Sequence, residues 1–373
     1  MNRKIRLILF SFFVFLYLLV APVLIVYSLG YRVDFENKKL VSTGGLYMKI
    51  WPQETEILID DKIEKKTGLF SNQILIQGLF PKKHSISVNK DGYYPWQKTL
   101  EIKDKEVTRV ENITLIKKEI FFEISKEKIN NFYFSPNRNL ILLLDSSQHF
   151  SLVNSQTKIE ENSFSLPKVI KNDVDVFSWD ENEKIITLET GDDYFSVDYN
   201  KTGLIEPKEI SLENSDKLVS AAKLTFKKEG AYIYLLDSET NNFDEFYQAK
   251  DIIFSPDKSK FLFFNDHEIL FAELKTPDQK NFLMRFSEKI NNCFWLNNYY
   301  IIFDVADSVK ISEIDTRDKI NMVDMETKIN LIDNSFVELK NPKIFFDEIN
   351  KKLYILNKNT LFVSKPLTDK NNK

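Results

Sequence analysis

At 373 residues the chain is long enough for two or three folded units, because one domain typically takes about 150 residues. Its 51 basic and 55 acidic residues are mixed along the chain and leave a formal net charge of −4. No broad basic field is present to neutralise a phosphate backbone, so nucleic acid is not an expected partner. The single cysteine, Cys293, excludes an intramolecular disulfide framework.

The first predicted element is a transmembrane helix over residues 7–31, preceded by a short tail, residues 1–6. No charged residue occurs in this run, and a helix of about 25 residues exceeds the roughly 30 Å thickness of the bilayer hydrocarbon. The lipid bilayer is therefore the first expected partner, bound through residues 7–31. A signal peptide cleaved after Gly30 remains an alternative, because Ser28-Leu29-Gly30 has a small residue at each end. The run is nevertheless longer than a typical signal core of about 7–15 residues, which favours an uncleaved anchor.

The basic residues around this span indicate its direction in the membrane. Three precede it and three follow it: Arg3, Lys4 and Arg6, against Arg32, Lys38 and Lys39. The first cluster is denser and includes the α-amino group, and a long C-terminal domain can translocate regardless of its charge. We expect a single-pass protein with a cytoplasmic N-terminus, a linker at residues 32–43 and the bulk of the chain outside the cytoplasm.

Residues 44–118 follow the pattern of a small β domain. Short runs alternate apolar and polar side chains, as half-buried strands do: Glu56–Asp60, Gln73–Ile76, Ser85–Val88 and Thr99–Ile102. Turn-forming residues separate these runs at Asp60-Asp61-Lys62, Pro81-Lys82-Lys83 and Lys90-Asp91-Gly92. The spacing predicts an antiparallel β-sandwich of about 70 residues.

Several segments of this domain together resemble the PEGA domain, a surface-associated β module of prokaryotic envelope proteins. They are Gly45-Leu46-Tyr47, Trp51-Pro52, Glu56–Asp61 and, most specifically, Pro81–Trp96 with its Gly-Tyr-Tyr-Pro-Trp end. The sequence departs from the family at Lys82 and Asp61, where glycine is usual, and at Gln53-Glu54-Thr55 in the naming motif. The resemblance implies an extracytoplasmic location and no catalysis.

Tyr93, Tyr94 and Trp96 allow two interpretations. Three aromatic side chains close together can form a platform for a sugar or a peptide. Aromatic residues beside a turn in a small sandwich more often complete its core, and we expect that role here.

Residues 119–366 contain a weak repeat in which a hydrophobic strand, a Ser-Pro-Asp type of turn and a second hydrophobic strand follow one another. The copies begin at Phe132, Val176, Ile252, Cys293 and Ile344, with a further candidate at Leu224. Most are about 40–50 residues apart, the period of a four-stranded propeller blade. The region resembles WD40-like and TolB-type β-propellers, and about six blades are expected.

The copy at Leu224 does not fit this period, because the interval from Phe226 to Phe254 is too short for a complete blade. Either one blade is degenerate or this copy is wrongly assigned. An open β solenoid or a pair of sandwiches also remains possible. The predicted fold class is thus mainly β: one transmembrane helix, a PEGA-like sandwich, a β-propeller and a polar C-terminal tail at residues 367–373.

The sequence offers little for catalysis. The three histidines, His84, His149 and His267, are isolated, and no zinc spacing, phosphate loop or nucleophile elbow occurs. Cys293 adjoins Phe294-Trp295 in an apparent core strand, where a thiol is inert. The acidic pairs Asp180-Glu181 and Asp192-Asp193 are expected in solvated turns. We therefore expect no enzyme, and no catalytic, metal-binding or cofactor-binding residue is assigned.

The resulting hypothesis is a non-catalytic, membrane-anchored envelope protein that displays a propeller for binding another envelope protein or a surface polymer. Propeller faces offer broad surfaces built from many loops, which favours a protein partner. Two alternatives remain: an extracytoplasmic hydrolase or lyase acting on a cell-surface polysaccharide, which needs convergent carboxylates, and a structural spacer. The sequence identifies no small-molecule cofactor, binding residue or oligomeric state.

Overall fold

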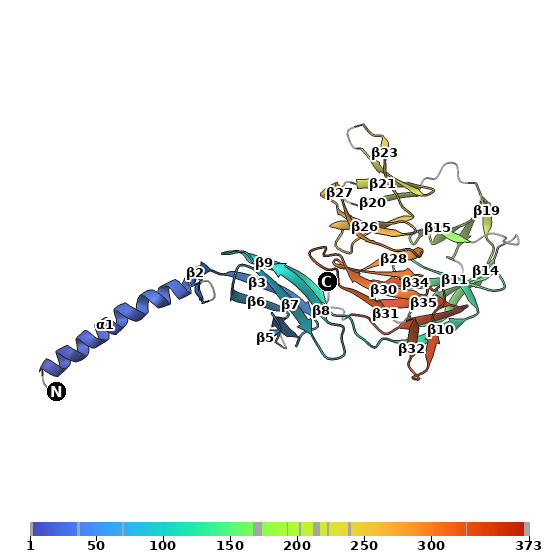
Figure 1. Ribbon diagram of the computed structural model, residues 1–373. Helices are drawn as coiled ribbons and strands as arrows, with labels where there is room; N and C mark the ends of the chain where they lie inside the picture. Colours follow the sequence, from blue (N-terminus) through green and yellow to red (C-terminus); the bar gives the residue numbers. More distant parts are fainter. Residues whose placement is uncertain are drawn as a thin grey trace. The chain divides into compact units, whose positions relative to one another are not determined.

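A computed structural model describes residues 3–35, 38–68, 71–166, 174–191, 193–200, 203–211, 217–221, 224–237, 240–325 and 327–368. The described chain is mainly β, with one N-terminal α-helix (Figure 1). It divides into two compact units. Unit 1 contains residues 1–118 together with 315–321, and unit 2 contains residues 119–314 and 322–373.

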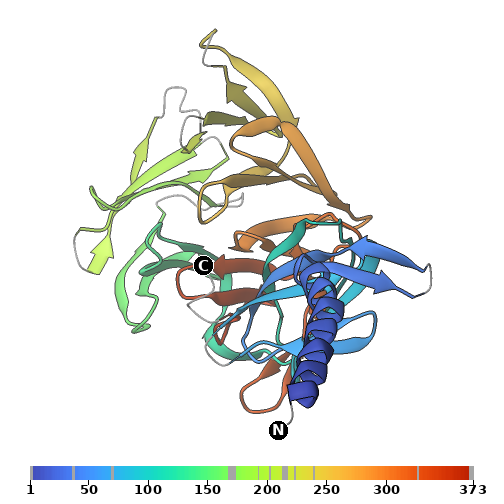
Figure 2. The same cartoon turned by 90° about the vertical axis from the view of Figure 1, so that its left-hand side faces the viewer.

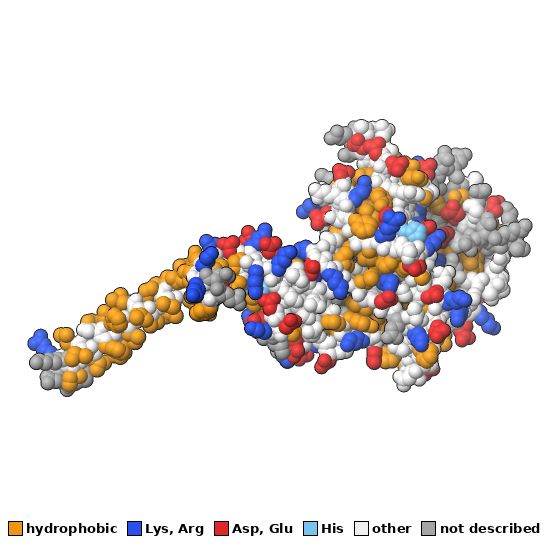
Figure 3. Space-filling view, viewed as in Figure 1, with side chains coloured by type: hydrophobic (Ala, Val, Ile, Leu, Met, Phe, Trp, Pro, Cys, Tyr) orange, Lys and Arg blue, Asp and Glu red, His pale blue; other side chains and the backbone are white. Residues whose placement is uncertain are grey.

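The helix α1 spans Arg3–Ser28 and includes Pro22. Within it, Ile5–Ser28 is apolar and long enough to cross a membrane, and none of this stretch is buried in the protein. Hydrophobic side chains cover the helix on the face that Figure 3 presents. The structure therefore has one N-terminal helix suited to a single-pass anchor, beginning and ending a few residues earlier than the predicted range of 7–31.

The segment predicted as a linker, residues 32–43, is instead largely a β-hairpin. Its strands β1 (Tyr31–Asp34) and β2 (Lys39–Ser42) pair only with each other, in a two-stranded sheet. Glycine at position 30 has a φ of 85° and makes the turn from helix to hairpin. The alternation in this segment is short, and charged residues interrupt it, which is why the pattern did not predict strands.

The rest of unit 1 consists mainly of two sheets. One contains β3 (Gly44–Trp51), β6 (Gln73–Leu79) and β9 (Val107–Thr114), with β3 and β9 parallel. The other contains β4 (Glu56–Ile59), β5 (Lys62–Lys66), β7 (Lys83–Asn89) and β8 (Trp96–Glu101), all antiparallel. Asp60 and Asp61 both have positive φ, 49° and 63°, so two aspartates form the tight hairpin turn.

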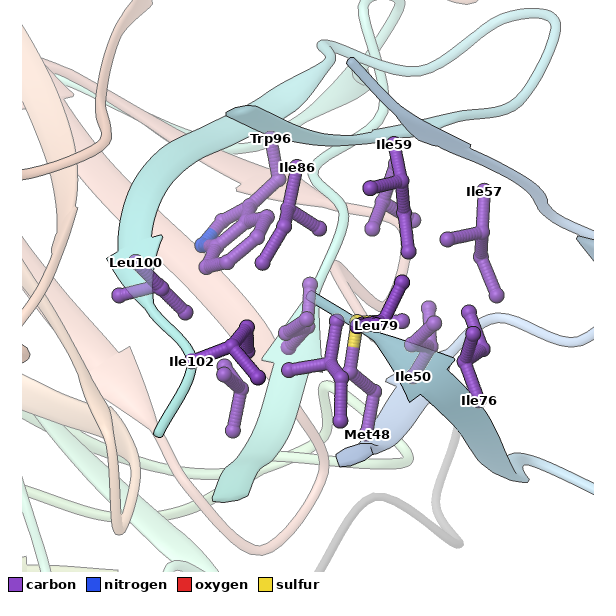
Figure 4. Packing of buried hydrophobic residues seen from close by; sticks show 14 of the residues in the cluster. Met48, Ile50, Ile57, Ile59, Ile76, Leu79, Ile86, Trp96, Leu100 and Ile102 are labelled. Atoms are coloured by element: carbon purple, nitrogen blue, oxygen red, sulfur yellow. The ribbon is translucent and has the colours of Figure 1, made fainter. Parts of the chain in front are cut away.

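One apolar core lies between these two sheets. Met48 and Ile50 of β3 face Ile57, Ile86 and their neighbours on the second sheet (Figure 4). Trp96 is 3 % exposed and belongs to this core, and Tyr93 packs against its edge. The alternation in the sequence thus marks the residues that face inward, since period-two side chains line one face of a strand.

Unit 2 is formed by six sheets of described strands, which follow one another along the chain (Figure 2). Sheet 1 contains β11 (Ile129–Phe134), β12 (Leu140–Asp145), β13 (His149–Asn154), β14 (Glu160–Ser165) and β18 (Gly203–Ile205). Sheet 2 contains β15 (Asp175–Asp180), β16 (Ile185–Thr190), β17 (Asp193–Asp198) and β19 (Lys208–Ile210). Sheet 3 contains β20 (Lys217–Ala221), β21 (Leu224–Glu229), β22 (Tyr232–Leu236) and β23 (Phe243–Gln248).

The C-terminal half of unit 2 continues this pattern. Sheet 4 contains β24 (Asp251–Phe254), β25 (Lys260–Phe264), β26 (Glu268–Glu273) and β27 (Thr276–Arg285). Sheet 5 contains β28 (Ile290–Asn297), β29 (Tyr300–Val305), β30 (Ser308–Glu313) and β31 (Met322–Met325). Sheet 6 contains β34 (Lys343–Asp347), β35 (Lys352–Asn357), β36 (Thr360–Ser364), β10 (Phe121–Glu127) and the hairpin β32 (Lys328–Leu331) and β33 (Phe336–Glu338).

The first strand of unit 2 completes its last sheet. β10 pairs antiparallel with β36 on one side and parallel with β32 on the other. Shared apolar cores join sheets 6 and 1, sheets 1 and 2, and sheets 3 and 4. The indole Nε1 of Trp295 donates to the carbonyl of Ile253 (2.9 Å) and links sheets 4 and 5, while Phe294 and Phe345 join sheets 5 and 6.

The repeat copy proposed at Leu224 is out of register with the others. Leu224–Glu229 is the second strand of sheet 3 and Tyr232–Leu236 the third, because β20 (Lys217–Ala221) precedes them. The short interval to Phe254 therefore reflects a copy assigned one strand too late. The first strand, Lys217–Ala221, contains no aromatic residue, whereas Phe226 in the second strand matches the Phe that marks the other copies.

The end of the chain also differs from the predicted polar tail of residues 367–373. Leu367 and Thr368 are buried, and the N–H of Leu367 donates to the carbonyl of Lys351 (2.8 Å). Residues 369–373 of that predicted tail lie outside the described residues.

Candidate functional site

The repeated Ser-Pro-Asp turns have the same geometry in two copies. In the first, Ser135 Oγ donates to Asn137 and accepts the N–H of Leu140 (both 3.0 Å); in the second, Ser255 Oγ donates to Asp257 (2.7 Å) and accepts the N–H of Lys260 (3.0 Å). Burial alone would raise the pKa of the Asp257 carboxyl, but hydrogen bonds from the two flanking serines together lower it below its ordinary value. These side chains are occupied in holding the turn.

The opposite end of the sheets is built differently. At this end the first strand of each sheet begins, next to the loop that joins the second strand to the third. In sheet 5, for example, Ile290 at the start of β28 pairs with Val305 at the end of β29, and Val305 pairs with Ser308 at the start of β30. Asparagine is frequent at this end: Asn130, Asn131, Asn291, Asn292, Asn341 and Asn359. We name this the asparagine end of unit 2.

A hollow of about 460 Å³ opens at the asparagine end. It is lined by the start of β11, the residues entering β15, the residues entering β34 and the β35–β36 turn. In that turn Lys358 and Asn359 both have positive φ, 47° and 66°, as a two-residue hairpin loop requires. The side chains of Asn130, Asn341, Lys358 and Asn359 are exposed around it.

Hydrogen bonds between sheets hold the wall of this hollow. Lys343 Nζ of sheet 6 donates to Asn131 Oδ1 of sheet 1 (2.6 Å), and Asn359 Nδ2 donates to Asn130 Oδ1 (2.5 Å). The backbone N–H of Ile129 donates to the carbonyl of Asn359 (2.9 Å). The polar groups are therefore held in fixed positions before any partner binds, which lowers the entropic cost of recognition.

The chemistry of the hollow suits hydrogen bonding and weak attraction of negative charge. Asparagine amides carry both donor and acceptor atoms, although Asn130 Oδ1 and Asn131 Oδ1 already accept hydrogen bonds within the wall, and Lys343 and Lys358 contribute two cations. Among the described residues that line the hollow, Asp175 is the single carboxylate. Glycoside hydrolysis by the usual mechanism needs two carboxylates across the scissile bond, so this lining lacks the pair that the hydrolase alternative requires.

Two titratable groups lie buried in sheet 5 near the same end. Asp304 is 0 % exposed, and burial raises the pKa of its carboxyl from the ordinary 3.8 to about 6, although its hydrogen bonds to Asn292 and Asn291 lower it. Cys293 is 1 % exposed, and burial together with the charge of Asp304 raises the pKa of its thiol. A protonated, enclosed thiol is a poor nucleophile.

The three histidines have separate surroundings. His84 is buried in unit 1, where Nδ1 lies 2.8 Å from Asp60 Oδ2 and Nε2 lies 2.8 Å from the carbonyl of Phe80. His149 contacts Ser165 (3.1 Å) in sheet 1, and the N–H of His267 donates to Asn265 in sheet 4. Within the described part of the chain, no group of three or more His, Cys, Asp and Glu side chains is placed to hold a metal ion.

The acidic pairs lie in turns or strand ends. Asp180 accepts the N–H groups of Asn182 and Glu183 (2.8 and 3.0 Å), and Glu181 accepts the N–H of Asn137 (2.8 Å). Asp193 begins β17, whereas Asp192 lies outside the described residues. These contacts give the Asp180-Glu181 carboxylates a structural role.

The aromatic group of unit 1 is divided between different environments. Trp96 faces the core, and Tyr94 lies half-buried with its N–H bonded to the carbonyl of Ile116 (2.9 Å). Tyr93 lines a hollow of about 570 Å³ whose other side chains are mostly charged or polar. The three rings therefore form no common platform.

Sequence reasoning did not identify the asparagine end. The available signal was a pair of residues, Asn130-Asn131, directly before the hydrophobic run that begins at Phe132, with a second pair, Asn291-Asn292, directly before the run that begins at Cys293. Asparagine is also common in ordinary turns, so this signal becomes informative only when the sheets bring the pairs to one end.

Comparisons with known proteins identify no family. No family model matches the chain, and no curated protein matches it. Among solved structures, Hsv2 from Kluyveromyces lactis covers 66 % of this chain and 76 % of its own, with 12 % identity and a TM-score of 0.36. An auxiliary nutrient binding protein from Bacteroides thetaiotaomicron covers 83 % and 90 %, with 10 % identity and a TM-score of 0.42. At TM-scores below 0.5, neither likeness establishes what this chain is or does.

Proposed function

We propose that this protein is a single-pass membrane protein that displays a binding module and has no catalytic activity. The observation that carries the proposal is the uncovered apolar helix Ile5–Ser28, none of which is buried against the two β units. Exposing some 24 residues of this kind to water is unfavourable, whereas a bilayer accommodates them. The N-terminus lies in the cytoplasm and both units lie outside it in this proposal.

Unit 2 is, in this proposal, a closed propeller of six blades that correspond to sheets 1–6. Support comes from the pairing of β10 with β36, which joins the first and last strands as a ring closure does, and from the cores shared between successive sheets. Unit 1 is the PEGA-like module, supported by its two sheets around Trp96 and its neighbours.

The asparagine end is the proposed binding surface, and an envelope protein is the favoured partner, with a surface polymer as the second possibility. The hollow of about 460 Å³, with its fixed amides and two lysines, supports binding over the structural-spacer alternative, which predicts no concave polar patch. Main-chain amides of a protein loop, or the hydroxyl groups of a polymer, match such donors and acceptors.

Protease protection tests the compartment. Intact and osmotically opened cells that express the C-terminally tagged full chain are digested, and the tagged fragment is sized. We expect that protease added outside the intact cells removes the tag, and that the undigested chain is membrane-bound and of full length. Protection until the cytoplasm is opened would overturn the proposed orientation, and a shortened soluble chain would indicate cleavage after Gly30.

Site-specific photocrosslinking tests the surface. Lys358 at the asparagine end and Lys258 in the Ser-Pro-Asp turn form a matched pair, because both are exposed lysines with positive φ, 47° and 53°. A photoreactive residue at position 358 is expected to give a discrete adduct in cells, and the same residue at 258 is not. Equal adducts at both positions, or adducts at 258 alone, would refute the assignment of the asparagine end.

A further inference from the structure

The hairpin β1–β2 is an unusual element to find beside a membrane-spanning helix. Only two residues separate Ser28 at the end of α1 from Tyr31 at the start of β1. The hairpin forms a sheet of its own, with no third strand. Two-stranded hairpins are marginally stable in water and normally need a further surface to cover them.

One face of this hairpin is apolar and uncovered within the described residues. Val33 and Leu40 are directly paired across the strands and are 50 % and 56 % exposed. Phe35, next to the hairpin turn, is 86 % exposed. Large apolar side chains exposed together mark a surface that contacts a partner or a membrane.

The hairpin is bonded to the end of the helix and to the sheets beyond it. The guanidinium of Arg32 lies 3.4 Å from the centre of the Tyr27 ring and donates to the carbonyls of Tyr27 and Tyr31 (2.8 and 2.9 Å). Directly after β2, Thr43 donates to the carbonyl of Gly30 through its N–H (2.9 Å) and its hydroxyl (2.6 Å), and its own carbonyl accepts the N–H of Lys105 (3.0 Å), between β8 and β9. The apolar face is thus held at the level where the helix leaves the bilayer.

A groove of about 1220 Å³ runs along this joint. One wall is the last part of the helix, from Pro22 to Tyr27, and the others are the hairpin and residues 78–82, which include the end of β6 and the turn after it. Among the described residues that line it, Arg32, Lys39 and Lys82 carry positive charge and Asp34 carries negative charge, and the Lys82 ammonium also lies 3.8 Å from the Asp60 carboxylate. Lys and Arg side chains gather where the helix meets the strands of unit 1 (Figure 3). The groove exceeds the usual 300–1,000 Å³ or so of a small-molecule site.

We infer that the hairpin lies in the interfacial layer of the bilayer and that the groove binds an anionic phospholipid. The acyl chain lies along the helix wall and Val33, Leu40 and Phe35 enter the same layer, while the phosphate is attracted by Lys39 and Lys82. Apolar side chains combined with cations are the composition that binds the headgroup–acyl boundary of anionic membranes. The inference rests on the proposed membrane anchor, because the groove's helix wall belongs to the spanning segment.

The test uses the full-length chain in lipid nanodiscs with a fluorophore on a single introduced cysteine. Phe35→Cys places the label on the hairpin, and Leu40→Cys is a second reporter; both native side chains are exposed, so folding is retained. Asp91→Cys is the control, since Asp91 is exposed and adjoins Gly92, whose carbonyl bonds to Lys118 at the far end of β3 and β9. The native Cys293 is buried and is replaced by serine in all three variants.

Phospholipids brominated near the headgroup are expected to quench the labels at 35 and 40 at least threefold more than the label at 91. Brominated phosphatidylglycerol is expected to quench at least twofold more than brominated phosphatidylcholine, and the double variant Lys39→Gln, Lys82→Gln removes this preference. Equal quenching at 35 and 91 would overturn the interfacial placement. Absence of a lipid preference, or a preference unchanged in the double variant, would overturn the anionic-lipid site.

Resistance of the same variants to alkaline extraction from liposomes separates this inference from the membrane anchor. A chain that withstands extraction but shows no quenching of the label at position 35 would support the membrane anchor and refute the interfacial placement of the hairpin. A chain that is extracted refutes the anchor itself, and with it the inference.

Discussion

Asp304 is a fully buried carboxylate of unit 2 whose pKa is raised. Its carboxyl lies in β29 and is 0 % exposed, with Oδ1 accepting the N–H of Asn292 (2.7 Å). The side-chain amide of Asn292 lies 3.4 Å from Oδ2, and Cys293 is the titratable neighbour. Burial disfavours the charged form, so the pKa rises from 3.8 to about 6.

Replacing Asp304→Asn is expected to stabilise the protein at neutral pH. The raised pKa means that the folded state binds the proton more tightly than the unfolded state. The protonated Asp304 carboxyl therefore contributes fully to the free energy of unfolding below about pH 4, and this contribution is lost as pH rises through about 6. The rise in pKa from 3.8 to about 6 corresponds to a loss of about 3 kcal/mol in the free energy of unfolding at neutral pH. The asparagine side chain of the variant carries no charge, so the variant does not lose this free energy.

Urea unfolding followed by tryptophan fluorescence at pH 4.5 and pH 7.5 measures this effect. Asp304→Asn is expected to be more stable than the parent at pH 7.5, with a much smaller difference at pH 4.5. Asp307→Asn, at an exposed carboxylate two residues after β29, is the control. Parallel pH profiles for the parent and Asp304→Asn would contradict the assignment.

At the scale of elements, β8 and the segment 315–321 are tied together inside unit 1. Lys98 of β8 is 1 % exposed, and its ammonium donates to the carbonyls of Asp315 (2.8 Å), Arg317 (2.7 Å) and Lys319 (3.0 Å). The N–H of Thr99 donates to the Asp318 carboxylate (2.6 Å). Three carbonyls satisfy one buried cation, as a lysine removed from water requires.

Replacing Lys98→Met is expected to release the segment 315–321. The three carbonyls lose a charged donor, and hydrogen bonds to charged groups contribute about 1.5–3 kcal/mol each. A loss of about 3 kcal/mol raises the population of the open segment roughly a hundredfold. Limited trypsin digestion, with mass spectrometry of cleavage after Arg317 and Lys319, measures this opening.

Lys103→Met replaces an exposed lysine five residues after Lys98 and is the matched control. It is expected to leave cleavage after Arg317 and after Lys319 unchanged. Similar digestion rates for Lys98→Met and the parent would show that other contacts, such as the Thr99–Asp318 bond, suffice to hold the segment.

At the scale of the whole molecule, the pairing of β10 with β36 makes the two ends of unit 2 depend on each other. Phe122 of β10 is 1 % exposed and pairs with Ser364 on one side and Leu331 on the other. Phe122→Ala is expected to cost about 3–5 kcal/mol, because it leaves a cavity where the first strand meets the last. A lower urea midpoint for unfolding of the full chain in detergent measures the loss.

Phe282→Ala is the matched control, since Phe282 is 54 % exposed on β27, and a change within about 0.5 kcal/mol is expected there. Equal unfolding midpoints for the two alanine variants would show that β10 contributes little and would weaken the proposed ring closure.

The elements that depend on near neighbours in the chain were predictable. The uncharged run of residues 7–31 by itself predicted an N-terminal helix long and apolar enough to cross a membrane, because hydrophobic length is a property of one segment. Alternation identified the inward residues of unit 1, and the hydroxyls of Ser135 and Ser255 hold their turns through hydrogen bonds to residues two and five positions away. The sequence pattern also predicted the strand pairs of five repeat copies, although it placed the copy at Leu224 one strand late.

The features on which the proposed function rests depended on the tertiary structure. Lys98 meets Arg317 across 219 residues, and Lys343 meets Asn131 across 212, so neither contact leaves a local pattern. The hairpin at Tyr31–Ser42 is too short to show a period, and its apolar face matters only because Arg32 and Thr43 hold it at the end of the helix. Hydrophobic length and turn chemistry act over a few residues, whereas the groove and the asparagine end exist only once distant strands pair.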